Sequence, residues 1–306
     1  MDKALLHRLL SERFDNDELS YDEPMAAHTT FGVGGPVDFF VSPSDVAGVR
    51  DAIEAARAAN AEWRCIGCGS NILVADEGLE GLVIHIGPNM SAIAQEGHCL
   101  VAEAGATNEE LANAALAAGL TGYEFASGIP GSVGGAAIMN AGAYEGEFKD
   151  VCVGVSCLDA TGKVIERSAQ ECEWGYRHSR MMDEGLVVLS AKICLIPWQK
   201  DQIKAKMDDL KRRREEKQPL EYGSAGSTFK RPLGYYAGKL IEDAGMRGHR
   251  VGDAQVSEKH CGFVINRGHA KASDVLGVIH DVQKAVFSDA GVHLEPEVRM
   301  WGFDDD

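Results

Sequence analysis

Ser127-Gly128-Ile129-Pro130-Gly131-Ser132-Val133-Gly134-Gly135-Ala136-Ala137-Ile138-Met139-Asn140-Ala141-Gly142-Ala143-Tyr144 is the stretch of this chain with the strongest structural signal. It holds five glycines in the sixteen residues from Ser127 to Gly142, and bulky polar side chains are nearly absent. A long loop with so little bulk usually leaves room for a flat or extended molecule against its backbone. A loop packed on its own sheet would explain any single glycine here, but it explains the whole run less well.

A second glycine-containing turn lies upstream, in Cys65-Ile66-Gly67-Cys68-Gly69-Ser70-Asn71-Ile72-Leu73-Val74. Its backbone N–H groups could converge on a pyrophosphate, and its glycines would let the chain approach the phosphate oxygens closely. The apolar run after the turn is typical of a strand rather than a helix, so this is not the Rossmann signature. A tight hairpin in an ordinary sheet would have a similar sequence. Cys65 and Cys68 have no second pair or matching histidine spacing, so we expect no metal site.

Hydrophobic periodicity predicts three regions of mixed helices and strands around these segments. Residues 1–86 begin with an amphipathic helix and continue as a βαβ-type pattern, with strands at 37–41, 63–66 and 82–86 and a helix from Ser44. Residues 87–200 have strands at 100–104, 151–158 and 187–195, and a helix that starts with Thr107 and Glu110 spaced as a reciprocal capping pair. Residues 201–306 mix helices at 203–217, 236–244 and 272–287 with strands at 251–256, 262–266 and 297–301. The sequence therefore predicts an α+β protein.

Composition narrows the class of protein. At 306 residues with 45% hydrophobic content, the chain is long enough for two or three domains with hydrophobic cores. The formal net charge of -17 argues against a general nucleic-acid binder, because duplex binding relies on surplus Lys and Arg. An anionic ligand must then meet local cations, for which Lys230, Arg231, Lys239 and Lys259 are available. The cluster Lys211-Arg212-Arg213-Arg214 lies in a predicted helix and fits a solvated helix face better than a binding site.

The lack of recognisable targeting signals and the distribution of the cysteines both predict a cytoplasmic protein. Charged residues interrupt the leucines of the first fourteen positions, so no signal peptide is expected, and no later apolar run is long enough to span a membrane. The eight cysteines are scattered, mostly inside strand-like apolar runs. We therefore expect reduced thiols and no disulfide bonds.

Six motifs resemble the UDP-N-acetylenolpyruvoylglucosamine reductase family, in the order found there, over roughly residues 20 to 302. They are His28-Thr29-Thr30-Phe31-Gly32-Val33-Gly34-Gly35-Pro36, the turn 67–74, the loop 128–142, Tyr176-Arg177-His178-Ser179, residues 223–230 and Leu294-Glu295-Pro296-Glu297-Val298-Arg299. About ten residues separate Arg177 from the strand at 187, which indicates the short form of the family, without the inserted tyrosine loop. Gly223 stands where proline is frequent.

The resemblance implies a two-lobed FAD-binding module of the vanillyl-alcohol-oxidase type, with α/β subdomains at 1–86 and 87–200, and a C-terminal α+β substrate-binding domain at 201–306. FAD would be held non-covalently, with the turn around its pyrophosphate and the loop along its flavin and ribityl chain. The implied FAD-binding residues are Gly67, Gly69, Ser70, Asn71, Ile72, Ser127, Gly128, Ile129, Pro130, Gly134, Gly135, Ala136 and Ala137.

The implied reaction is the NADPH-dependent reduction of UDP-N-acetylglucosamine enolpyruvate to UDP-N-acetylmuramate in peptidoglycan synthesis. Hydride transfer from flavin N5 to C3 leaves enolate charge at C2, which must be stabilised and protonated. Arg177 could grip the substrate carboxylate in bidentate fashion. Glu297, as a neutral acid, could donate a hydrogen bond to the enolate, and Ser227 would deliver the proton. Glu295 is the alternative to Glu297, and Ser224 is the alternative to Ser227.

Substrate contacts follow from the same motifs. Lys230, Arg231 and Lys239 are expected near the diphosphate, and Tyr176 with Lys259 or His260 nearer the sugar. The expected partners are the UDP-sugar and NADPH, with no nucleic acid and no membrane, and we expect a monomer. Two other functions stay open: an FAD-linked oxidase acting on another small molecule, which oxygen would reoxidise faster than the enolpyruvyl substrate, and a non-catalytic nucleotide-binding module, which would be colourless.

Overall fold

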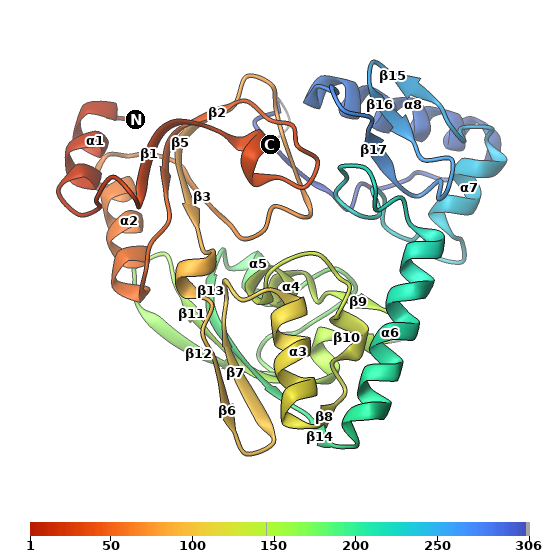
Figure 1. The fold of residues 1–306 in the computed structure, drawn as a ribbon. Coiled ribbons are helices and arrows are strands. Elements are labelled where there is room, and N and C mark those ends of the chain that lie inside the picture. The colour runs from red at the N-terminus through yellow and green to blue at the C-terminus, as the bar shows by residue number, and fades with distance from the viewer. Residues whose placement is uncertain (145, 304–306) are drawn as a thin grey trace. The chain divides into compact units, whose positions relative to one another are not determined.

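Helices and strands alternate along the chain in an α+β arrangement, as the sequence predicts (Figure 1). This computed structural model describes residues 1–144 and 146–303. The chain divides into two compact units that interleave in sequence. Unit 1 comprises residues 1–21, 39–68 and 81–214, and unit 2 comprises residues 22–38, 69–80 and 215–306. The three-domain division expected from the sequence stays a prediction.

A four-stranded sheet in the order β1-β2-β5-β3 is formed by the N-terminal part of the chain. Its strands are β1 (Leu19–Pro24), β2 (Pro36–Val41), β3 (Trp63–Ile66) and β5 (Leu79–His85), and β3 runs parallel to β5. Helices α1 (Lys3–Ser11) and α2 (Val46–Ala58) begin where the side chains of Asp2 and Asp45 accept hydrogen bonds from backbone N–H groups. Leu6 and Leu10 of α1 are buried while most of its other residues are exposed, which confirms the predicted amphipathic helix at the start of the chain.

A second sheet, in unit 1, has five antiparallel strands in the order β12-β11-β13-β7-β6. These strands are β6 (Ile93–Glu96), β7 (Cys99–Glu103), β11 (Cys152–Leu158), β12 (Val164–Ser168) and β13 (Val187–Cys194). Helix α3 (Asn108–Ala118) starts with the capping box predicted for Thr107 and Glu110, and it ends at Gly119 in the left-handed conformation. Apolar side chains of β11 and β13 are buried in the core of this unit.

The glycine-rich stretch contains a helix, α4 (Val133–Met139), so the prediction of an uninterrupted loop is wrong there. The Ser132 side chain caps the start of α4 by accepting a hydrogen bond from Gly135 N–H, and Asn140 ends it in the left-handed conformation with φ of +43°. Val133 and Ala137 are fully buried where α4 packs on β13. Capping and burial therefore outweigh the low helix propensity of the two glycines.

Shorter elements connect these parts of the chain. They are η1 (Met25–His28), η2 (Pro88–Met90), β8 (Leu120–Thr121), η3 (Glu124–Ala126), β9 (Gly142–Ala143), β10 (Gly146–Glu147), η4 (Phe148–Asp150), α5 (Arg180–Asp183) and β14 (Ile196–Pro197). Helix α6 (Lys200–Lys217) then carries the chain out of unit 1, because Arg214 belongs to unit 1 and Glu215 to unit 2.

Unit 2 packs helices α7 (Ala237–Asp243) and α8 (Ala272–Ala290) with a three-stranded sheet, β15 (Arg250–Val251), β16 (Ala254–Val256) and β17 (Val264–Asn266). The single strand predicted for 251–256 is wrong, because Gly252, with φ of +53°, turns the chain between β15 and β16. Strand β18 (Arg299–Trp301) runs parallel to β4 (Ile72–Val74). Within the described residues, no helix combines the length and the apolar character needed to cross a membrane.

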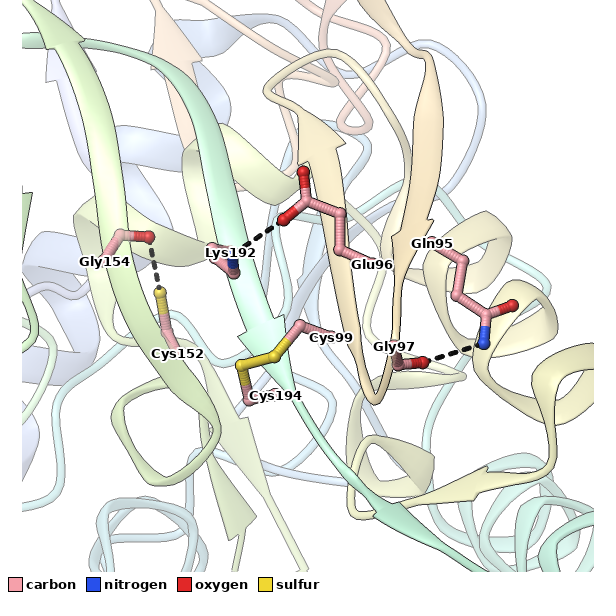
Figure 2. The surroundings of a disulfide bond; sticks show 8 residues. All are labelled: Gln95, Glu96, Gly97, Cys99, Cys152, Gly154, Lys192 and Cys194. Atoms are coloured by element: carbon pink, nitrogen blue, oxygen red, sulfur yellow. Dashed lines mark hydrogen bonds and ion pairs between the residues drawn. A yellow bond between two sulfur atoms is a disulfide. The ribbon is translucent and has the colours of Figure 1, made fainter.

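Cys99 and Cys194 form a disulfide bond, so the expectation that all cysteines are reduced is wrong (Figure 2). The two residues face each other across β7 and β13. The next pair is hydrogen-bonded, from Leu195 N–H to the His98 carbonyl, so the cysteines occupy a non-hydrogen-bonded site, where opposing side chains lie closest. Because the two cysteines are 95 residues apart in sequence, their pairing could not be predicted from cysteine spacing.

Replacing both Cys99 and Cys194 by serine should lower the free energy of unfolding by about 2–4 kcal/mol, because the bond restricts the unfolded chain. Urea titration of the oxidised proteins measures the difference. Cys68→Ser removes an exposed free thiol and is the matched control, with an unchanged unfolding midpoint expected. The disulfide would be refuted if the denatured, unreduced wild-type protein titrated with eight reactive thiols instead of six.

Candidate functional site

The turn between β3 and β4 has backbone donors to offer a ligand. The N–H groups of residues 67–70 have no hydrogen-bond acceptor among the described residues. Gly69 has φ of +59°, and a Cβ there would lie 1.9 Å from the His28 carbonyl oxygen, so only glycine fits. Unpaired amides in a short turn are suited to binding the oxygens of a phosphate. Asn71 and Ile72 follow, and Ile72 begins β4.

The loop before α4 is held by its neighbours while part of its backbone stays unpaired. The hydroxyl and the N–H of Ser127 both donate to the Glu124 carbonyl, and the buried Asn108 donates to the carbonyls of Ile129 and Gly131. The N–H groups of Gly128, Gly131 and Ser132 have no acceptor within residues 1–144 and 146–303. Pro130 is exposed. This loop can therefore donate backbone hydrogen bonds to a bound molecule.

The later predicted FAD-binding positions, 134–137, lie in α4. Gly134 donates its N–H to the Ala104 carbonyl, and a Cβ on Gly134 would lie 2.8 Å from the Ala104 Cβ. Gly134 thus allows the helix to pack closely on the end of β7. Ala136 and Ala137 are buried, and Gly135 is more open, with the Ser132 hydroxyl as its nearest neighbour at 3.5 Å from a built Cβ.

Arg214 is a residue of this region that the sequence interpretation missed. Its side chain is 6% exposed, it donates a hydrogen bond from a terminal guanidinium nitrogen to the Gly128 carbonyl, and its Cζ lies 5.7 Å from the centre of the Tyr144 ring. The predicted solvated face of residues 211–214 is therefore wrong for Arg214, although the three residues before it are exposed. The signal was available, because Arg214 continues the buried stripe of Ile203, Met207 and Leu210 at helical spacing.

The segment that carries Tyr176 and Arg177 wraps around the C-terminal end of α4. Arg177, with φ of +54°, donates to the carbonyls of Asn140 at 3.4 Å and Gly142 at 3.1 Å. Trp174 donates its indole N–H to the Ala137 carbonyl, and Ser179 donates its hydroxyl to the Ile138 carbonyl. The carbonyls left over at the end of α4 are thus satisfied by side chains from this one segment. Tyr176 is 49% exposed, with the Arg177 guanidinium 5.1 Å from its ring centre.

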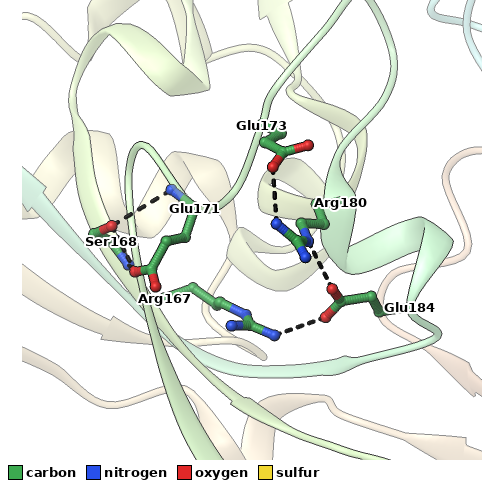
Figure 3. A network of polar contacts seen from close by, with 6 residues as sticks. All are labelled: Arg167, Ser168, Glu171, Glu173, Arg180 and Glu184. Carbon is green, nitrogen blue, oxygen red and sulfur yellow. Dashed lines mark hydrogen bonds and ion pairs between the residues drawn. The ribbon is translucent and has the colours of Figure 1, made fainter.

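Ion pairs fix the same segment from the other side (Figure 3). Arg180, in α5, pairs with Glu173 at 2.8 Å and with Glu184 at 2.6 Å. Arg167, on β12, reaches Glu184 at 2.8 Å. A network of several pairs holds its side chains better than an isolated surface pair does. It therefore anchors the short loop 173–184.

In unit 2, Thr30 joins two of the predicted motifs. Its N–H donates to the Gly69 carbonyl at 3.2 Å, and its hydroxyl donates to the Ser224 carbonyl at 2.6 Å. The close approach of these two segments also explains the glycine at position 223. A Cβ there would lie 2.8 Å from the Phe31 carbonyl oxygen. A glycine at position 223 lets the serine-containing loop lie directly against the Thr30 segment.

Thr228 brings Ser227 and Glu297 into one part of unit 2. Thr228 is fully buried, its carbonyl accepts a 2.8 Å hydrogen bond from Glu297 N–H, and its own N–H donates to the Gly262 carbonyl. Phe229 forms an isolated antiparallel bridge with Pro296. Asn71 adds a 3.1 Å hydrogen bond from its side-chain amide to the Glu297 carbonyl. Ser227 itself is exposed.

The predicted substrate cations are all in unit 2, and most are already paired with acidic groups. Lys230 pairs with Glu295, Lys239 with Asp243, and Lys259 with Glu221 at 4.0 Å. Lys259 also donates a hydrogen bond to the backbone carbonyl of Glu215. The Arg231 guanidinium lies 4.0 Å from the centre of the Tyr236 ring. His260 differs from the lysines and the arginine in that burial lowers its pKa, which favours the neutral imidazole. Its Nδ1 accepts a hydrogen bond from Gly262 N–H.

Comparison with known proteins identifies the family of this chain. Residues 218–301 match the C-terminal domain of UDP-N-acetylenolpyruvoylglucosamine reductase, and residues 36–168 match an FAD binding domain. A UDP-N-acetylenolpyruvoylglucosamine reductase of Agathobacter rectalis is 52% identical over 305 residues, covering 96% of this chain and 97% of the relative. The chain belongs to the UDP-N-acetylenolpyruvoylglucosamine reductase family.

Two further relatives agree with this assignment. A reductase of the same name from Clostridium perfringens is 47% identical over 298 residues, covering 97% of this chain and 98% of the relative. The crystal structure of the enzyme from Thermus caldophilus is 34% identical, with a TM-score of 0.80 over 93% of this chain and 98% of that chain. The chain is therefore an FAD-dependent oxidoreductase of peptidoglycan synthesis that forms UDP-N-acetylmuramate, as the resemblance implied.

The residues present fit FAD. Consecutive unpaired amides at 67–70 suit a pyrophosphate, and the unpaired amides of Gly128, Gly131 and Ser132 suit an extended molecule along the loop. The predicted assignment of individual residues to parts of FAD stays a prediction.

His260 should make the protein less stable in acid. Its folded pKa is lowered, so the unfolded chain binds the proton at higher pH, and this contribution to stability is lost as pH falls below about 6.5. His260→Asn keeps an oxygen that can accept from Gly262 N–H but cannot be protonated. Between pH 7.5 and 5.0, the melting temperature should fall less in this variant than in the wild type. Parallel decreases would show that His260 does not titrate in this way.

Proposed function

We propose that NADPH reduces the bound FAD, and that the reduced cofactor then reduces UDP-N-acetylglucosamine enolpyruvate with Ser227, Glu297 and Arg177 as the catalytic residues. Bound FAD supplies the hydride, which reaches C3 of the substrate. The observation that carries the proposal is the hydrogen bond from Glu297 N–H to the Thr228 carbonyl, which places Glu297 opposite the residue after Ser227. A proton donor and a second acid thus come from adjoining segments of one unit.

Ser227 is proposed to deliver the proton to C2. Its hydroxyl has no hydrogen-bond partner within the part of the chain that the structure describes, so it can turn toward a substrate carbon. Gly226, with φ of +73°, sets the turn that presents it. Ser224 is less suited to this role, because its N–H and its carbonyl are both tied to Thr30. A weak acid such as serine serves here because the enolate is strongly basic and the transfer is short.

Glu297 is proposed to donate a hydrogen bond to the enolate oxygen from its neutral form. Glu295, its alternative, is already engaged in an ion pair with Lys230. The Glu297 backbone is held at both polar groups, by Thr228 and by Asn71. Such a fixed backbone suits a residue whose side chain must meet one oxygen atom.

Arg177 is proposed to bind the substrate carboxylate, since a planar guanidinium can grip both oxygens. Its bonds to the carbonyls of Asn140 and Gly142 orient the guanidinium. For the UDP moiety we propose Lys230, Arg231 and Lys239 at the diphosphate, and Tyr176, Lys259 and His260 nearer the sugar, with neutral His260 acting as a hydrogen-bonding group. A monomer working in the cytoplasm, where NADPH is available, completes the proposal.

An NADPH oxidation assay with the enolpyruvyl substrate tests the function as a whole. Substrate should reoxidise the reduced enzyme far faster than oxygen does. Faster reoxidation by oxygen would support an oxidase instead.

Ser227→Ala should leave flavin reduction by NADPH nearly intact and slow the second half-reaction by orders of magnitude, because it removes only proton delivery. Stopped-flow absorbance of the flavin separates the two steps. Ser224→Ala, the matched control, should slow neither step by more than a few fold. Equal impairment of both half-reactions in Ser227→Ala would remove the proposed role.

Glu297→Ala should slow substrate reduction by about 100-fold or more, since a positioned hydrogen-bond donor at developing charge is worth about 10² to 10³ in rate. Glu295→Ala breaks the ion pair with Lys230 and is the matched control, for which we expect less than a tenfold loss. Single-turnover rates with pre-reduced enzyme give the comparison. A larger loss in Glu295→Ala would exchange the roles of the two carboxyl groups.

A further inference from the structure

Arg214 holds a buried positive charge for which the described residues supply no carboxylate. Its Nε is buried and has no hydrogen-bond partner among the described residues, while the rest of the guanidinium contacts the Gly128 carbonyl and both the ring and the hydroxyl of Tyr144. Taking a guanidinium out of water without an anion costs several kcal/mol. Burial also lowers the pKa of Arg214, which expresses the same cost. A buried unpaired donor of this kind requires an explanation, and one explanation is that it binds a ligand.

The location of this donor indicates which ligand it meets. A Cβ built on Gly128 would lie 3.0 Å from the Arg214 Nε, so the unpaired Nε lies directly beside the Gly128 backbone. The Gly128 N–H also has no acceptor among the described residues. Two unpaired donors therefore adjoin one another in the loop that we assign to the flavin part of FAD.

Arg167 provides a contrast within the same unit. Its Nε is the other buried side-chain atom without a hydrogen bond among the described residues. Its guanidinium, however, pairs with Glu184 at 2.8 Å, so its charge is compensated (Figure 3). Of these two arginines, only Arg214 combines an unpaired Nε with a charge that no carboxylate of the described residues pairs with.

We propose that Arg214 is a binding residue for the flavin ring of FAD, with its Nε–H donating to a flavin acceptor atom and its charge stabilising the reduced, anionic flavin. The proposal rests on the assignment of residues 127–130 to the flavin. A fixed cation beside the ring is one of the means by which a protein tunes a flavin. The loop then supplies backbone donors, while α6 supplies the charge.

Arg214→Met tests this by removing the charge and the donor while keeping an apolar chain of similar length. We expect at least a tenfold rise in the Kd for FAD, from titration of the apoprotein. We also expect the two-electron midpoint potential to fall by about 30 mV or more, which is a tenfold loss of preference for the reduced form. Arg214→Lys keeps the charge but has no donor at Nε, so it should bind FAD more weakly and keep the potential.

Arg213→Met is the matched control, because Arg213 is exposed on α6 and pairs with Asp209; both measurements should equal the wild type. An unchanged potential in folded Arg214→Met would overturn the proposal, even with a raised Kd, since a residue on the phosphates affects both redox states equally. If Arg214→Met does not fold, an unchanged Kd in Arg214→Lys would overturn it. Both measurements omit NADPH and the UDP-sugar, so failure of the proposed reaction would not change them.

Discussion

Buried backbone N–H and C=O groups must find hydrogen-bond partners, and this constraint positions the functional residues. Thr228 is the clearest case. Its N–H bonds to Gly262, its carbonyl accepts from Glu297, and its hydroxyl accepts from Val264 N–H at 2.9 Å. A single buried residue, through its backbone and its side chain, therefore joins three segments that are far apart in sequence. Ser227 and Glu297 owe their common position to it.

The end of α4 shows the same constraint in unit 1. A helix leaves its last carbonyls without internal partners, and small residues such as those of α4 cannot satisfy them. Trp174, Arg177 and Ser179 supply the donors. Arg177 therefore has a structural task at the helix terminus besides the one we propose with substrate, and a substitution there can affect both.

The order of helices and strands could be predicted from the sequence because long amphipathic or alternating patterns dominate it. Most of the predicted elements agree with the structure to within a few residues. The candidate catalytic and FAD-binding residues were predicted from six motifs rather than from periodicity, and their roles stay predictions. Thr30 and Thr228, which hold those motifs together, gave no such signal, because these two threonines make their contribution through partners distant in sequence.

The errors have physical causes. Helix α4 was predicted as a loop because glycine has a low helix propensity. The capping by Ser132 and the packing on β13 that stabilise the helix could not be predicted from local propensity. The burial of Arg214 could not be recognised from the charged run 211–214, because only one of its four residues turns inward on the helical period. Strand register decides that Cys99 meets Cys194, and cysteine spacing does not encode register.

The interleaving of the two units has a consequence for biosynthesis. Residues 22–38 and 69–80 leave the ribosome early, but their packing partners in 215–306 are made only after the whole of unit 1. Unit 2 therefore cannot complete its fold until those later residues have been synthesised, unlike a domain formed from one continuous stretch. During that interval the nascent chain carries the two early segments without their hydrophobic partners.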